Sequence, residues 1–145
     1  MSLPRNILVP TDLGDQAPRV LAYAAALAGA TNATLHIVHA FSQPMLGFEV
    51  PVVLSPATMD DLTAQARTQL DQLASSCAAP AQIASVMLEI GDPRSVILQA
   101  AEQVHADLIV MGTHSRRGIS RLVLGSVAES VARAVHCPVL LFREP

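Results

Sequence analysis

The sequence contains no lysine, because all nine of its basic residues are arginine. A Walker-type phosphate loop and a Schiff-base enzyme both need a lysine, so the sequence excludes both kinds of site. Tryptophan is also absent, and there are only one tyrosine and three phenylalanines. Few aromatic side chains and a formal net charge of -3 argue against a surface that stacks bases or neutralises nucleic-acid phosphates.

The sequence also lacks the signs of export and of membrane insertion. Its two cysteines, Cys77 and Cys137, are far apart and form no Cys-x-x-Cys pattern, which favours packed free thiols in a reducing compartment. The apolar stretch near the start is interrupted by Asp12, unlike a signal peptide, and no apolar run is long enough for a bilayer. We therefore expect a cytoplasmic protein, with residues 1–145 forming a single domain.

Short β-rich runs alternate with segments of helical periodicity along the chain. The predicted strands are 6–11, 33–41, 81–90, 106–112 and 137–143, and the predicted helices are 17–31, about 57–78, 93–106 and 125–136. This alternation is typical of an α/β protein with an open five-stranded parallel sheet and helices on both faces. Segment 42–57, with three prolines, is expected to be irregular: either a surface loop folded on its own domain, or a flap or partner contact.

Two of the predicted strands end in residues suited to ligand binding. The first strand ends in "VPTD", with Thr11 and Asp12, and the fourth ends in "MGTHSRRG". In open parallel sheets, ligands bind outside the carboxyl ends of the strands, where the strand order reverses. If these two strands are neighbours at that point, the two groups share one crevice, but the sequence alone does not establish that they are neighbours.

Segment 111–130 has the composition of either an anion site or a glycine-rich turn that leads into a helix. Gly112 lets the backbone leave the sheet, Gly118 adds freedom, and Gly125 with Ser126 opens a helix whose N–H groups attract phosphate. The Ser126 hydroxyl could donate to the anion or cap the helix. A local positive charge comes from three arginines, which are also consistent with a solvated surface: Arg116, Arg117 and Arg121.

These residues resemble the nucleotide-binding branch of the universal stress protein family. The family's motif is Gly-x-x-Gly, nine residues, then Gly-Ser or Gly-Thr; here Gly112-Thr113-His114-Ser115 is followed by nine residues and Gly125-Ser126. The resemblance covers the whole chain, including "ILVPTD", "HIVHA", "GDPRSVILQAA" and "SVAESVARAVHCPVLLFR". It implies a flavodoxin-like, Rossmann-like sheet of order 3-2-1-4-5, and homodimers that pair through the C-terminal strand. That strand is apolar and would be an edge that needs cover.

The resemblance further implies an adenine-nucleotide site for ATP, with or without Mg²⁺, in a stress-response protein that senses nucleotides. Carried over to this sequence, the site has an adenosine end, a base contact, a floor, a phosphate loop and a helix start. Pro10, Thr11 and Asp12 would line the adenosine end, and Ala40 would lie near the base. Met111 and Gly112 would form the floor of the site. The phosphate loop would be His114, Ser115, Arg116, Arg117 and Gly118, and the helix start would be Gly125, Ser126 and Val127.

Ser115 stands where the family's motif has its second glycine. If that position needs a left-handed backbone, serine costs about 1–2 kcal/mol, although its hydroxyl could donate to a phosphate oxygen. We expect weakened rather than abolished ATP binding. The alternative is a nucleotide-free, dimeric stress or partner-binding protein of the same fold.

No catalytic or metal site is expected. The sequence shows no Ser-His-Asp order, paired-carboxylate motif or cysteine-nucleophile signature, so the chain would hydrolyse ATP slowly at most. His36 and His39 are three residues apart on a predicted strand and would point to opposite faces. His114 is either a loop residue or a direct phosphate contact.

Overall fold

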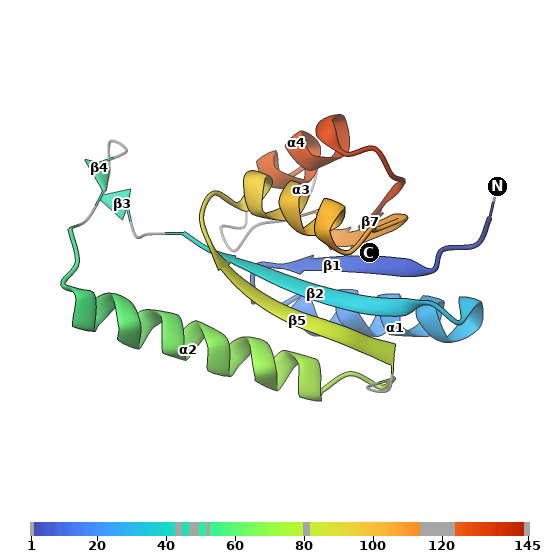
Figure 1. The fold of residues 1–145 in the computed structure, drawn as a ribbon, viewed down its shortest axis with the longest axis horizontal. Coiled ribbons are helices and arrows are strands. Elements are labelled where there is room, and N and C mark those ends of the chain that lie inside the picture. Colours follow the sequence, from blue (N-terminus) through green and yellow to red (C-terminus); the bar gives the residue numbers. More distant parts are fainter. Residues whose placement is uncertain are drawn as a thin grey trace.

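A computed structural model describes residues 2–42, 45–46, 50–51, 53–79, 82–113 and 124–143. Five parallel strands form its main sheet: β1 (Asn6–Thr11), β2 (Thr34–Phe41), β5 (Ile83–Ile90), β6 (Leu108–Gly112) and β7 (Val139–Phe142). They lie in the order β5-β2-β1-β6-β7 (Figure 1). Counted along this sheet alone, that is 3-2-1-4-5, which confirms the predicted order and the α/β class.

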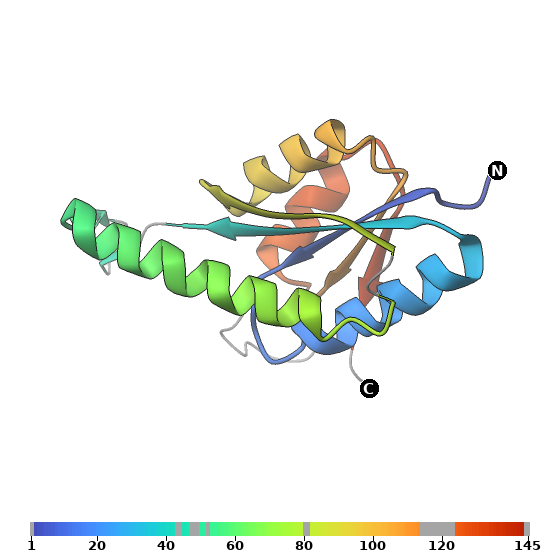
Figure 2. The ribbon, with the colours of Figure 1, turned by 60° about the horizontal axis from the view of Figure 1, so that its bottom comes forward.

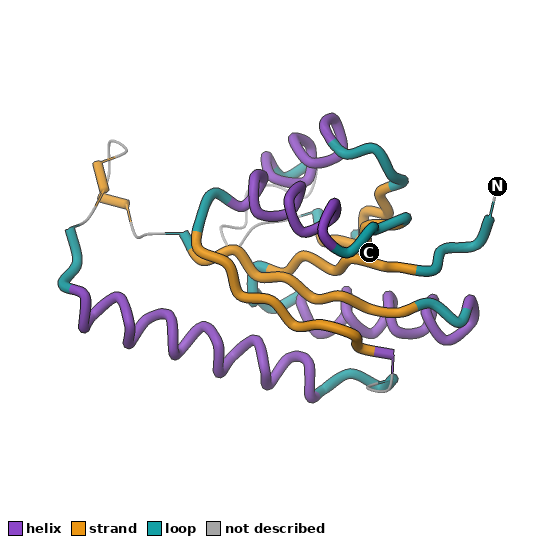
Figure 3. The backbone as a smooth tube through the Cα atoms, viewed as in Figure 1, coloured by secondary structure: helices purple, strands orange, loops and turns teal. Residues whose placement is uncertain are grey.

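Four helices cover the sheet on its two faces: α1 (Ala17–Thr31), α2 (Pro56–Ser75), α3 (Pro93–Gln103) and α4 (Ser126–Ala134). Figures 1 and 2 show α1 and α2 on one face and α3 and α4 on the other, and Figure 3 shows the strands between the two helical layers. Both faces of the sheet are therefore buried, as the continuous apolar runs in the strands predict.

The two helical layers enclose two separate apolar cores. Ile7 and Val9 of β1 belong to the core beneath α1 and α2, whereas Leu8 belongs to the core beneath α3 and α4. This is the two-residue alternation of a strand that is buried on both sides. On α1 the buried face is mostly alanine, including Ala24, Ala25 and Ala28, which lets this helix pack closely on the sheet.

Three helix boundaries differ from those predicted, each for a local reason. Helix α2 begins at Pro56 because the Ser55 hydroxyl caps it, accepting from the Thr58 N–H at 3.2 Å. Helix α3 ends at Gln103, before 106, because His105 adopts a left-handed conformation with φ 51°. Helix α4 ends at Ala134 because Val135 is extended.

The sequence predicts that segment 42–57 is irregular, but the structure shows that part of it is regular. Two short strands, β3 (Met45–Leu46) and β4 (Val50–Pro51), pair antiparallel within it and form a second sheet. Figure 1 shows them beside the start of α2, beyond the end of β2. Residues 43–44, 47–49 and 52 lie outside the described part of the chain.

Both cysteines are free, as expected from their spacing. Cys77 is buried in the core beneath α1 and α2, and Cys137 is half-buried just before β7. Burial raises the pKa of the Cys137 thiol, which makes it less nucleophilic at neutral pH. Of the helices that the structure describes, none combines the length and apolarity that a membrane crossing requires.

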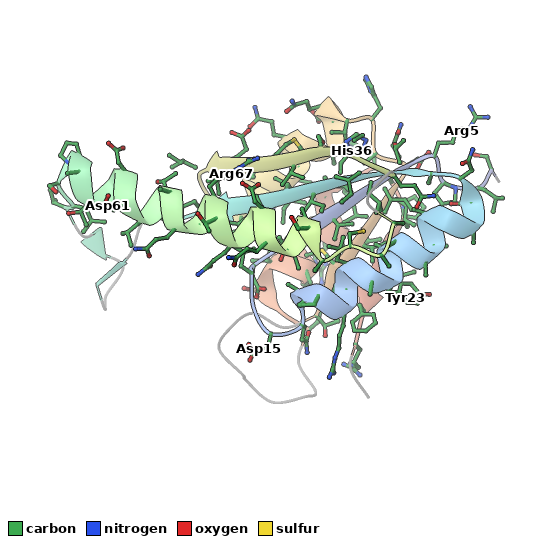
Figure 4. All side chains as sticks on the ribbon, turned by 90° about the horizontal axis from the view of Figure 1, so that it is seen from below. Arg5, Asp15, Tyr23, His36, Asp61 and Arg67 are labelled. Atoms are coloured by element: carbon green, nitrogen blue, oxygen red, sulfur yellow. The ribbon has the colours of Figure 1, made fainter. Side chains whose placement is uncertain are left out.

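A row of polar side chains crosses the sheet at the amino ends of β1, β2 and β5. His36 Nδ1 lies 2.7 Å from the Ser85 hydroxyl and its Nε2 lies 3.4 Å from the Thr34 hydroxyl, which donates to Asn6 Oδ1 at 2.9 Å. Figure 4 labels His36 on the sheet and Arg67 on α2. Arg67 donates to the Val86 carbonyl at 3.1 Å and so ties α2 to β5.

We predict that His36 makes the folded state sensitive to mild acid. Burial lowers the pKa of His36 below its ordinary 6.5, so on acidification the unfolded chain takes up this proton before the folded chain does. Stability from neutral His36 is present above pH 6.5 and is lost as pH falls toward the lower folded pKa. Urea unfolding from about pH 7.5 to about pH 5.5 should cost wild type more stability than His36→Gln. Equal losses in both proteins would contradict this role.

Candidate functional site

A cleft opens at the carboxyl ends of β1 and β6, which pair directly in the sheet. From β1 the chain continues to β2 on one side, whereas β6 is followed by β7 on the other, so the strand order reverses between these two strands. The cleft has a volume of about 290 Å³. The adjacency that the sequence left open is therefore present, and the cleft lies where open α/β sheets bind ligands.

All of the predicted site residues that the structure describes line this cleft. They come from the ends of β1, β2 and β6 and from the start of α4: Pro10, Thr11, Asp12, Ala40, Met111, Gly112, Gly125, Ser126 and Val127. Their binding roles stay predictions. The other predicted site residues lie outside the described part of the chain, as does Arg121: His114, Ser115, Arg116, Arg117 and Gly118.

A tight turn after β1 holds Asp12 at the mouth of the cleft. The Thr11 hydroxyl accepts from the Leu13 N–H at 3.0 Å, and Asp12 Oδ1 accepts from the Gly14 N–H at 2.8 Å. Leu13 has a positive φ of 59°. A Cβ atom on Gly14 would lie 2.9 Å from Asp12 Oδ1, so a larger residue at this position would push the Asp12 carboxylate out of its place in the turn. The turn leaves Asp12 exposed, with its carboxylate positioned to accept from a donor on a ligand.

The start of α4 also lines the cleft. Gly125 is the N-cap residue, with no side-chain cap, and its φ of -57° is one that any residue can adopt. Its N–H donates to the Thr113 carbonyl at 2.8 Å, which joins the start of α4 to the end of β6. The prediction that Ser126 might cap the helix is wrong, because Ser126 is the first helical residue. Within the described part of the chain, therefore, no side chain caps the first N–H groups of α4, and such groups attract anions.

Several lining residues were not predicted, because they reach the cleft through tertiary packing. His39 is one of them: its Nδ1–H donates to the Thr11 carbonyl at 2.8 Å, which links the ends of β1 and β2. Apolar residues from the sheet and helices make up most of the remainder. The full set is Val9, Gln16, Ala17, Val20, Val38, His39, Leu73, Pro93, Ile97, Thr113 and Ala128.

The lining of the cleft is mostly apolar and includes two polar features of opposite character. Asp12 brings a carboxylate at the end of β1, and the start of α4 brings the positive end of a helix dipole. Such a site suits a ligand with an apolar body, a hydrogen-bond donor and an anionic group. Among the described residues, no three His, Cys, Asp or Glu side chains are grouped so as to hold a metal ion.

Comparison with known sequences decides the family. The sequence profile described as the universal stress protein family matches residues 4–143. The chain belongs to the universal stress protein family. A similar relative is universal stress protein MJ0531 of Methanocaldococcus jannaschii, which is 32% identical over 99% of this chain and 85% of its own length.

Solved structures of the family share the fold. A universal stress protein from Archaeoglobus fulgidus superposes with a TM-score of 0.72 at 27% identity, over 94% of this chain and 97% of its own. A universal stress protein crystallised in complex with cAMP gives a TM-score of 0.67 at 27% identity, over 98% of both chains.

We predict that Asp92 stabilises the helix that carries Pro93 and Ile97 to the cleft. As the N-cap of α3, its Oδ2 accepts from the Ser95 N–H at 3.0 Å and from the Ser95 hydroxyl at 2.9 Å. The backbone bond, and then the hydroxyl, lower the pKa of Asp92. This contribution is present above the unfolded-state pKa and is lost as pH falls through the folded one.

Asp92→Ala should therefore lower the free energy of unfolding by about 1 kcal/mol at neutral pH. Asp92→Asn is the matched control, because asparagine caps nearly as well without the charge. Urea denaturation of the three proteins at neutral pH measures the difference. Identical midpoints for wild type and Asp92→Ala would contradict the capping role.

Proposed function

We propose that this chain binds an adenine nucleotide, with ATP as the physiological ligand and Mg²⁺ as a companion of its phosphates. The nucleoside would lie in the apolar part of the cleft with its ribose toward Asp12, and the phosphates would meet the start of α4. The observation that carries the proposal is that the start of α4, which has no side-chain cap bond at Gly125, lines the same cleft as the Asp12 carboxylate. The related universal stress protein in complex with cAMP supports an adenine nucleotide as the ligand class.

We further propose that the nucleotide acts as a signal within a cytoplasmic homodimer that takes part in the stress response. Strand β7 is the edge of the sheet, and its four residues are only half-buried. A second copy pairing along this apolar edge would cover it. The binding site and this edge are connected, because the Thr113 N–H donates to the Phe142 carbonyl of β7 at 3.2 Å. The free cysteines fit a reducing compartment.

Nucleotide binding is tested by titration calorimetry with ATP, with and without Mg²⁺. We expect wild type to bind and Gly125→Val to bind roughly tenfold or more weakly, since a side chain would crowd the phosphates at the helix start. The backbone at Gly125 accepts valine, so the fold should persist. Gly29→Val is the matched control, because the space around Gly29 on α1 is open. At the sequence level, Ser115→Gly restores the family's motif and should tighten binding.

The absence of binding in wild type, at any ATP concentration that the titration reaches, would contradict the proposed function. So would unchanged binding in Gly125→Val. Binding by Ser115→Gly alone would favour the alternative, a nucleotide-free member of the family that works through its protein contacts.

Dimer formation through β7 is tested by a proline on its free edge. The carbonyls of Pro138 and Phe142 accept from β6, so the alternating backbone groups of Val139 and Leu141 point to the free edge. Val139→Pro removes a donor from that edge without breaking a bond to β6. Analytical ultracentrifugation should show a dimer for wild type and for the control Val139→Thr, and a monomer for Val139→Pro. A monomeric wild type, or a dimeric Val139→Pro, would contradict the interface.

A further inference from the structure

The cleft contains buried polar atoms that the fold itself leaves without partners. Among the described residues, three buried side-chain polar atoms have no hydrogen-bond partner: Gln16 Oε1, Gln82 Oε1 and Thr113 Oγ1. Two of these residues, Gln16 and Thr113, line the cleft. Leaving a buried hydroxyl unsatisfied is unfavourable, and native proteins do so rarely. Such an atom in a cleft indicates a partner that arrives with the ligand.

Thr113 is the more deeply buried of the two, with 4% of its surface exposed. Its backbone is held on both sides, since its N–H donates to the Phe142 carbonyl at 3.2 Å and its carbonyl accepts from the Gly125 N–H at 2.8 Å. These bonds fix the residue between β7 and the first turn of α4. Gln16 lies at the other side of β6: its Oε1 would be 3.5 Å from a Cβ atom on Gly112, toward α1.

Thr11 provides a direct contrast with Thr113. Both threonines stand at the carboxyl end of a central strand and line the same cleft. The Thr11 hydroxyl accepts from the Leu13 N–H at 3.0 Å and so shapes the turn after β1. The Thr113 hydroxyl has no such bond. The first is used by the fold, and the second is available to a ligand.

We propose that the Thr113 hydroxyl is a phosphate ligand: it donates to a phosphate oxygen of the nucleotide at the start of α4. This inference rests on the proposed function and adds a residue that the family's glycine motif does not specify. A hydroxyl has one hydrogen to donate, and a phosphate oxygen is a strong acceptor. The α4 N–H groups and this hydroxyl then converge on one anion. The two backbone bonds of Thr113 hold its main chain in place before a ligand arrives. Only the side chain then has to turn for the hydroxyl, which is buried in this structure, to reach the phosphate.

The experiment compares Thr113→Val, Thr113→Ser and Thr11→Val with wild type. Calorimetry with AMP and with adenosine separates the phosphate from the nucleoside, and urea unfolding without ligand measures the fold. Thr113→Val should weaken AMP binding roughly tenfold to a hundredfold, the value of a hydrogen bond to a charged group. Adenosine binding should be nearly unchanged, and Thr113→Ser should retain most of the AMP affinity. A merely structural threonine would not show this difference between the two ligands.

The unliganded proteins give a second readout. Valine has nearly the shape of threonine, and the Thr113 hydroxyl satisfies nothing in the fold, so Thr113→Val should be at least as stable as wild type. Thr11→Val should be less stable, because it removes the hydrogen bond from the Leu13 N–H to the Thr11 hydroxyl.

Three outcomes overturn the inference when wild type binds AMP. Wild-type AMP affinity in Thr113→Val would refute the phosphate role while leaving the proposed function intact. An equal loss for AMP and adenosine would assign the hydroxyl to the nucleoside instead. Lower unliganded stability in Thr113→Val would show that the hydroxyl serves the fold. If wild type binds no adenine nucleotide, ATP included, the proposed function itself fails, and this inference fails with it.

Discussion

The hydrogen bond from the Gly125 N–H to the Thr113 carbonyl, at 2.8 Å, is the interaction on which the candidate site depends. It holds the first turn of α4 against the end of β6, so that the positive end of a helix dipole faces the edge of the sheet. The pairing of β1 with β6 then brings Asp12 to the same cleft. Together with the burial of Ala128 and Val131 in the core beneath α3 and α4, this bond places the helix start and the carboxylate in one cleft.

The same backbone segment serves both the fold and the proposed binding. Thr113 bonds to α4 through its carbonyl and to β7 through its N–H, whereas its hydroxyl has no hydrogen-bond partner. At Asp12, one carboxylate oxygen accepts from Gly14 and maintains the turn. A ligand at this site would therefore meet groups whose positions are set before it arrives, which reduces the entropic cost of ordering them.

Sequence patterns predict the elements well where the physics is local. The β1 and α1 boundaries match because an apolar run ends at Thr11 and because the turn and Pro18 mark the start of α1. The predicted order of the sheet came from resemblance to the family, since alternating strands and helices alone fit several orders. Serine favours the N-cap position, which is why the sequence suggests Ser126 as a cap. In the structure the N-cap is the preceding residue, Gly125, whose N–H is bonded to the Thr113 carbonyl.

Other features depend on contacts between distant parts of the chain, and sequence patterns do not reveal them. Thr113 lies inside the glycine motif, yet the residues beside it in the sequence do not show that its hydroxyl differs from that of Thr11. The difference is visible only in the structure, where the Thr11 hydroxyl accepts from the Leu13 N–H and the Thr113 hydroxyl has no hydrogen-bond partner. His39 and Gln16 line the cleft because β2 and the start of α1 pack beside β1 and β6. The sequence does carry one signal for His39 and Gln16: each lies close to the carboxyl end of a predicted strand or just before the helix that follows one, where ligands bind in such sheets.

The central claim, that a nucleotide phosphate binds at the start of α4, is tested most directly by amide NMR. Backbone ¹⁵N–¹H spectra would be recorded as AMP is added, with adenosine as the comparison. The account predicts that AMP, and not adenosine, produces its largest shifts at the N–H groups of Ser126, Val127 and Thr113. Shifts from AMP that spare these amides and fall on another part of the molecule would contradict it.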